Sequence, residues 1–138
     1  MESMDLEIRV RYSETDQMGV VYHGNYAQYF EMGRVEWLRN LGISYKNLEE
    51  EGVMLPVVSL SVIYKKPALY DELLKLRTTF KKCTAVRIEF DYELFNEAGE
   101  LLTTANSILV FMDANTRRPM GAPEIGKERL KLMEKKEV

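Results

Sequence analysis

One stretch of helical periodicity within a chain of strand-like segments constrains the fold most. Between residues 26 and 41 the apolar side chains recur every three or four positions, at Tyr26, Tyr29, Phe30, Trp37 and Leu41. This spacing predicts a helix of about four turns, roughly 24 Å long. Asn25 is suited to cap its start, and Gly42 is suited to end it. We interpret Gly33, in mid-helix, as a point of close approach to a sheet.

The other segments read mainly as strands. Residues 6–12, 74–81 and 86–94 alternate apolar with polar side chains, residues 57–65 are rich in β-branched side chains, and residues 101–112 are apolar on both faces, as in a central strand. "FNEAGE" predicts a hairpin turn with Gly99 in the left-handed conformation. A short helix is expected from Ser44 to about Glu51, closed by Gly52, and an amphipathic helix from Pro123 onward. Only the long helix is large enough to cover the sheet, which predicts an α+β hotdog fold: an antiparallel β-sheet wrapped around one central helix, as a single domain over residues 1–138.

Composition excludes several classes of function. The 138 residues carry a net charge of -3, so we expect no nucleic-acid partner, and an anionic ligand would need a local basic patch. The single cysteine, Cys83, cannot form an internal disulfide, which suits a reducing cytoplasm. The chain shows no apolar run long enough for a secretion signal or a membrane span. No group of His, Cys and Asp has metal-ligand spacing, and we expect neither a metal nor a cofactor.

The stretch "SETDQMGVVYHGNYAQYF" holds the only histidine, His23, seven residues after Asp16 and directly before the long helix. A carboxylate can deprotonate water or attack a carbonyl itself, and the first turn of a helix offers free N–H groups. From spacing alone, Asp16 is more typical of a turn or cap residue than of a catalytic one, and His23 is more typical of a structural or exposed side chain. Ser13 and Thr15 are interpreted as loop-capping residues, because no Ser-His-Asp arrangement is available to them.

These residues also carry a resemblance to a family. "RVRYSETDQMGVVYHGNYAQYFEMGRVEWLRNLG" resembles the opening of hotdog acyl-CoA thioesterases of the 4-hydroxybenzoyl-CoA thioesterase type, in particular their YbgC-like branch. "VIYKKPALYDEL" and "FMDANTRRPM" are similar to later parts of that family, so the resemblance covers nearly the whole chain. It implies hydrolysis of an acyl-CoA thioester. It further implies that Asp16 is the catalytic carboxylate and that the backbone N–H of His23 binds the thioester oxygen.

A candidate site follows from this resemblance and from the chemistry. The N–H groups of His23 and Gly24 would form the oxyanion site, and Gly24 would let the acyl group approach the backbone. The His23 imidazole would orient Asp16 or water, or protonate the leaving thiolate. Tyr22 and Asn25 flank this site and are expected to contact substrate. Candidates for binding the CoA phosphates are Lys65 and Lys66, Arg117 and Arg118, and Lys81 and Lys82; candidates for lining the acyl pocket, on a partner subunit's sheet, are Val58, Ser59 and Leu60.

Exposed sheet edges predict a homodimer or a homotetramer. Two further readings stay open. The first is a non-catalytic hotdog protein that binds acyl-CoA or acyl carrier protein, in which Asp16 only shapes its loop. The second, a hotdog dehydratase, fits less well because His23 precedes the helix instead of lying on it. The sequence leaves open the acyl group, the thiol carrier, and whether Asp16 acts as base or nucleophile.

Overall fold

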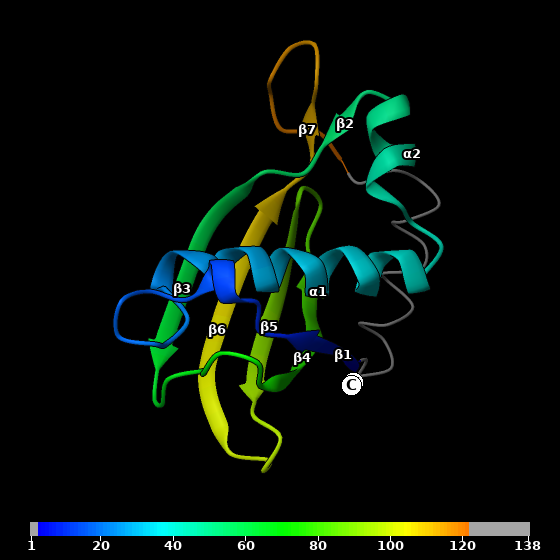
Figure 1. Cartoon of the computed structure of the whole chain (residues 1–138). Helices are drawn as coiled ribbons and strands as arrows, with labels where there is room; N and C mark the ends of the chain where they lie inside the picture. Colours follow the sequence, from blue (N-terminus) through cyan, green and yellow to red (C-terminus); the bar gives the residue numbers. More distant parts are fainter. Residues whose placement is uncertain (1–2, 122–138) are drawn as a thin grey trace.

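The computed structural model describes residues 3–121, which form a five-stranded antiparallel sheet crossed on one face by a single long helix (Figure 1). The strands are β1 (Ser3–Arg9), β3 (Val57–Tyr64), β4 (Leu73–Cys83), β5 (Arg87–Phe95) and β6 (Leu101–Val110), and they lie in the order β1-β4-β5-β6-β3. The helix is α1 (Tyr26–Asn40). The predicted fold class is therefore confirmed, and the strand over residues 101–112 is internal, lying between β5 and β3.

The periodic apolar face of α1 builds the core. Trp37 stacks on Phe80 of β4 with ring centroids 5.3 Å apart, and Phe30 lies 4.8 Å from Tyr92 of β5. All four side chains are buried. Gly33 faces β4 so closely that a Cβ atom there would lie 2.3 Å from Thr78 Oγ1. The predicted close approach of helix and sheet at this glycine is confirmed.

The two ends of α1 differ from each other in how well they were predicted. At the C-terminal end, Gly42 has φ 88°, its N–H bonds to the Arg39 carbonyl, and the next N–H, of Ile43, bonds to Leu38, which is a Schellman motif. At the other end, the predicted Asn25 cap is wrong. A 3-10 turn, His23–Asn25, leads directly into α1, and the Asn25 side chain makes no capping bond because it is turned toward another partner.

The first strand ends earlier than its alternation predicts. β1 stops at Arg9, and residues Tyr12–Glu14 form a 3-10 turn with the Tyr12 side chain exposed. The register with β4 runs out at the pair Arg9↔Leu73. Just beyond it, buried Val10 still bonds to the Glu72 carbonyl and accepts the N–H of Asp71. Arg11 and Tyr12, which the alternation assigns to the strand, therefore belong to the loop that follows β1.

Smaller elements complete the described chain. α2 (Tyr45–Glu50) starts as predicted, because Ser44 Oγ accepts the Asn47 N–H at 3.0 Å, and it is followed by Gly52 at φ 78°. Gly99 adopts φ 83° in the predicted hairpin turn. The sequence did not predict the short pair β2 (Val53–Met54) and β7 (Met112–Asp113). The helix predicted from Pro123 lies outside the described residues, and no helix within residues 3–121 is long and apolar enough to cross a membrane.

Candidate active site

Asp16 lies at the base of a tight turn between β1 and α1. Its Oδ1 accepts the N–H of Met18 at 2.9 Å, and its carbonyl accepts the N–H of Gly19, which has φ 78°. The Asp16 N–H in turn bonds to the carbonyl of Val20. Oδ1 is thus used to shape the turn, whereas Oδ2 accepts no hydrogen bond from residues 3–121. The side chain is half-buried and keeps one carboxylate oxygen for a ligand.

The start of the helix presents two N–H groups next to this turn. Among the described residues, the N–H groups of His23 and Gly24 have no hydrogen-bond acceptor, since the first bonds of the 3-10 turn use the N–H groups of Asn25 and Tyr26. A Cβ at Gly24 would lie 2.6 Å from Cε2 of Tyr22, so glycine lets the Tyr22 ring fold over the turn. The exposed His23 imidazole packs on that ring, with centroids 4.4 Å apart.

Backbone pairing holds the Asp16 turn beside the segment that enters the helix. Thr15 and Val21 form an antiparallel bridge, and the Tyr22 N–H bonds to the Glu14 carbonyl at 2.9 Å. On the other side, Val20 pairs with Leu69. A free carboxylate oxygen and two free N–H donors therefore belong to one connected loop.

A cavity of about 250 Å³ opens beside the helix start. It is lined by Val21, His23, Tyr26, Tyr64, Lys65, Lys66 and Pro67. Tyr26 and Tyr64 meet edge to face at 5.1 Å, and the Tyr64 hydroxyl lies 3.4 Å from the carbonyl of His23. Burial raises the pKa of Tyr26, so its hydroxyl stays protonated in this wall. The cavity combines aromatic walls with two lysines at its rim.

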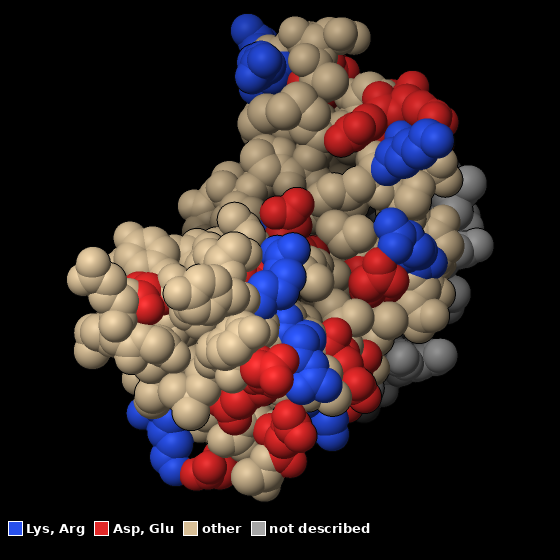
Figure 2. Space-filling view, viewed as in Figure 1, with Lys and Arg blue, Asp and Glu red and all other residues tan. Residues whose placement is uncertain are grey.

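The predicted basic pairs do not meet in one patch. Lys65 and Lys66 follow β3 at one end, whereas Arg117 and Arg118 lie in the turn after β7, at the other end of β3 (Figure 1). Lys81 pairs with Glu89 at 3.4 Å near the far end of β4. Figure 2 shows the face of the molecule that α1 crosses, and the Lys and Arg side chains on this face are likewise separated into groups. Of the three predicted pairs, only Lys65 and Lys66 line the cavity that includes His23, and the Lys66 ammonium is paired with Glu100.

Other candidate residues are placed elsewhere. Val58, Ser59 and Leu60 are exposed on the edge strand β3 and do not line the cavity beside His23. Tyr22 is exposed as well, and Asp16, Tyr22, Gly24 and Asn25 are not among the residues that line that cavity. The roles predicted for these residues, and for Asp16, His23, Gly24 and Asn25, stay predictions.

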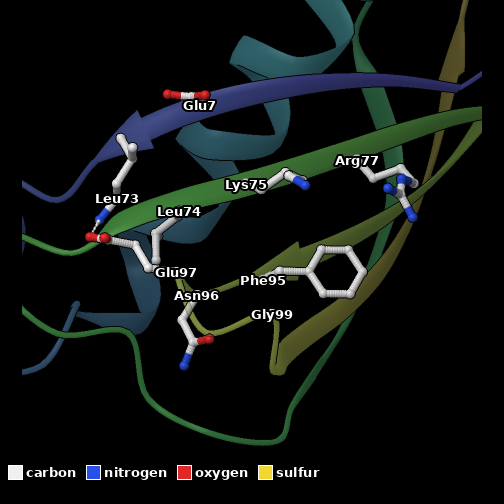
Figure 3. Close-up of a pocket in the computed structure, with 9 residues that line it drawn as sticks. All are labelled: Glu7, Leu73, Leu74, Lys75, Arg77, Phe95, Asn96, Glu97 and Gly99. Carbon is white, nitrogen blue, oxygen red and sulfur yellow. Dashed lines mark hydrogen bonds between the residues drawn. The ribbon is translucent and has the colours of Figure 1, made fainter.

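A second hollow lies on the sheet face that points away from α1, over β1, β4 and the β5–β6 turn (Figure 3). There the Arg77 guanidinium lies 5.4 Å from the centroid of the Phe95 ring and is bonded to Asp5. Its cation is already paired, and none of the predicted site residues lines this hollow. Among residues 3–121, no group of three or more His, Cys, Asp or Glu side chains could hold a metal ion.

Comparison with known proteins decides the family. A family model described as the thioesterase-like superfamily matches residues 10–130. The chain belongs to this superfamily. It is 40% identical over 114 residues to the "Putative acyl-CoA thioesterase YneP" of Bacillus subtilis, covering 83% of each chain, and 32% identical over 117 residues to the "Acyl-CoA thioester hydrolase YbgC" of Escherichia coli O6:H1, covering 85% of this chain and 87% of that one. The predicted resemblance, and with it a thioester hydrolase, is confirmed.

Solved structures of thioesterases share the fold. The DHNA-CoA thioesterase of Staphylococcus aureus is 37% identical, with a TM-score of 0.91, covering 100% of this chain and 97% of that one. The 1,4-dihydroxy-2-naphthoyl-CoA thioesterase Slr0204 of Synechocystis is 25% identical, with a TM-score of 0.88, covering 96% and 98%. These TM-scores, over nearly the whole of each chain, show that the fold is shared.

Glu14, in the loop between β1 and α1, is a residue of this site that was not predicted from the sequence. Glu14 is buried, its carbonyl bonds to Tyr22, and its carboxylate accepts a bond from Tyr29 on α1. Its position two residues before Asp16 could have drawn attention to it, but the contact with Tyr29 spans fifteen residues. No local pattern predicts a contact over that separation.

Proposed function

We propose that the protein hydrolyses acyl-CoA thioesters, with Asp16 as the base or nucleophile and the N–H groups of His23 and Gly24 as the oxyanion site. The names of the relatives YneP and YbgC support an acyl-CoA substrate. The observation that carries the assignment of residues is the pairing of a free carboxylate oxygen with two free N–H groups on one loop.

The reaction follows from these groups. Asp16 removes a proton from water as the water oxygen attacks the thioester carbonyl carbon, or it attacks that carbon itself and forms an anhydride that water then opens. In either case the carbonyl oxygen becomes negative, and the N–H groups at the helix start stabilise it together with the helix dipole. As the carbonyl re-forms, the C–S bond breaks and the CoA thiolate leaves. On the base route the thiolate takes up the proton that Asp16 removed from water. On the nucleophilic route this cleavage gives the anhydride, water then opens it, and a proton of that water passes to the thiolate; the products of both routes are the free acid and CoA.

The cavity beside His23 suggests where the substrate lies. Of the three predicted basic pairs, we propose Lys65 and Lys66 for the CoA phosphates, because they share a cavity with the helix start. Lys66 would exchange its ion pair with Glu100 for one with a phosphate. Tyr26 and Tyr64 in its wall suit an aromatic acyl group, and two structural relatives are named for 1,4-dihydroxy-2-naphthoyl-CoA or DHNA-CoA. A hydrolysis panel of short aliphatic, long aliphatic and aromatic acyl-CoAs, with acyl carrier protein thioesters beside them, measures this preference by release of free thiol.

A second candidate function is supported by a separate observation. Because Asp16 Oδ1 accepts the Met18 N–H, the residue also has a plain role in shaping the turn. This favours the reading of a non-catalytic protein that binds acyl-CoA or acyl carrier protein. The cytoplasmic location stays a prediction from the single cysteine.

Asp16→Asn separates the two functions. The amide oxygen of asparagine can still accept the Met18 N–H, so the turn is kept while the negative charge is removed. We expect turnover of the best acyl-CoA to fall at least ~100-fold, as for loss of a general base or nucleophile. Asp5→Asn, on the outer face of the sheet beside Arg77, is the matched control and should keep parental turnover. Parental turnover in Asp16→Asn, with an unchanged melting temperature, would refute the catalytic assignment.

A further inference from the structure

Glu14 is a buried carboxylate that the reaction above does not use. Only 7% of the residue is exposed, and four donors surround its side chain. Oε1 accepts the Tyr29 hydroxyl at 3.0 Å and the Arg11 N–H at 2.7 Å, while Oε2 accepts Nη2 and Nε of Arg11 at 3.1 and 3.3 Å. Burying a charge is costly unless it is paired and hydrogen-bonded, and these donors meet that cost.

The backbone of Glu14 makes further contacts with the helix entry. Its carbonyl accepts the N–H of Tyr22 at 2.9 Å and the side-chain amide of Asn25 at 2.8 Å. The second of these bonds explains why Asn25 does not cap α1. Glu14 therefore holds the residues immediately before and within the 3-10 turn through its carbonyl, and Tyr29 inside α1 through its carboxylate.

We propose that Glu14 is a positioning residue, whose bonds to Tyr29, Tyr22 and Asn25 fix the Asp16 carboxylate relative to the N–H groups of His23 and Gly24. The inference rests on the proposed function. Among the described residues, Asp16 bonds only within its own turn, so its position relative to α1 depends on the bonds at the base of that turn. A misplacement of about 1 Å between reacting groups can reduce a rate about 100-fold.

Tyr29 is suited to this contact. Burial and the hydrogen bond to Glu14 both raise the pKa of Tyr29, so its hydroxyl remains a donor across the neutral range. Tyr29 is fully buried in the first turn of α1, so it ties the carboxylate to the packed side of the helix. Arg11, by contrast, is largely exposed and balances the charge from the solvent side.

Three variants test the role of the carboxylate. Tyr29→Phe removes the donor and keeps the ring, and Glu14→Leu removes both acceptor oxygens. We expect kcat to fall ~10-fold or more in each, with KM within about 2-fold, because orientation is lost and substrate contacts are kept. Glu14→Gln keeps an oxygen that can accept from both Tyr29 and Arg11, so it should restore kcat to within about 3-fold of the parent.

Tyr92→Phe is the matched control for a purely structural effect. It makes the same change at another buried tyrosine, whose hydroxyl lies 2.6 Å from Ser107 Oγ and accepts Nη1 of Arg34 at 3.3 Å. It therefore also removes a hydrogen bond between α1 and the sheet, but one that involves no residue of the β1–α1 loop. We expect it to lower the melting temperature and leave kcat unchanged. If Tyr29→Phe keeps parental kcat, or if Tyr92→Phe lowers kcat as much as Tyr29→Phe does, the positioning role is overturned.

Amide hydrogen exchange distinguishes failure of this inference from failure of the proposed function. The Tyr22 N–H, which bonds to Glu14, should exchange faster in Tyr29→Phe and at the parental rate in Tyr92→Phe. Should the parent hydrolyse no thioester in the panel, the proposed function fails and exchange alone tests the contact. In that case an unchanged Tyr22 exchange rate in Tyr29→Phe overturns the inference.

Discussion

His23 carries two separable groups, an imidazole and a backbone N–H, and the structure treats them differently. The imidazole is exposed and packs on the ring of Tyr22, with no hydrogen bond to any described residue. The N–H is one of the two donors without an acceptor at the helix start. We therefore expect the backbone group to contribute more to turnover than the side chain.

Two substitutions at residue 23 measure these groups separately. His23→Ala keeps the N–H and should reduce kcat less than about 10-fold, below the 10²–10⁴-fold of general acid or base help. His23→Pro removes the N–H and should reduce kcat on the order of 10²–10³-fold, as for loss of an oxyanion donor. Proline fits here because residue 23 is the first of the 3-10 turn and Tyr22 is extended (φ -63°, ψ 134°). A larger loss in His23→Ala than in His23→Pro, with both variants folded by circular dichroism, would reverse this assignment.

At the scale of the element, the packing of α1 on β4 depends on Gly33. A Cβ there would lie 2.3 Å from Thr78 Oγ1 and 2.8 Å from Leu76 Cδ2, and both of these side chains are buried. Gly33→Ala would gain about 1 kcal/mol of helix propensity, but overpacking a core typically costs about 1–3 kcal/mol. We expect net destabilisation in urea unfolding, partly relieved in the double variant with Thr78→Ala. Gly121→Ala, whose Cβ would lie 3.9 Å from the nearest atom, is the control and should not destabilise.

The same helix shows what sequence could predict and why. The apolar period and the pair Gly33 and Gly42 are local signals, and they predicted the length of α1, its contact with the sheet and its end. The position of Asp16 before the helix was visible too. The contact between Glu14 and Tyr29 was not, because it depends on how the β1–α1 loop folds back on the helix. Asn25 was misread for that reason: the Glu14 carbonyl competes for its side chain.

At the scale of the whole molecule, one edge of the sheet is unfinished. Within residues 3–121, β3 pairs only with β6. Large apolar side chains are exposed along its length, at Val57, Val58, Leu60, Ile63 and Tyr64. An exposed apolar edge strand is a template for pairing with another chain. A second copy that pairs its own β3 antiparallel under a twofold axis would cover this edge on both molecules. It would also place the exposed residues Val58, Ser59 and Leu60 against the second copy. This agrees with the sequence-based prediction that these residues line an acyl pocket formed with a partner subunit.

A charge introduced into this apolar edge tests the assembly and its link to activity. The parent should scatter light as a particle of at least twice the 16.1 kDa of one chain. Leu60 lies mid-strand, so Leu60→Lys would place two like charges near the twofold axis and should give a monomer. Met32→Lys is the control, because Met32 is similarly exposed (44% against 41%) but lies on α1. If the partner's strand completes the acyl pocket, the variant should lose turnover when it becomes a monomer. A folded Leu60→Lys monomer with parental activity would show that one subunit suffices.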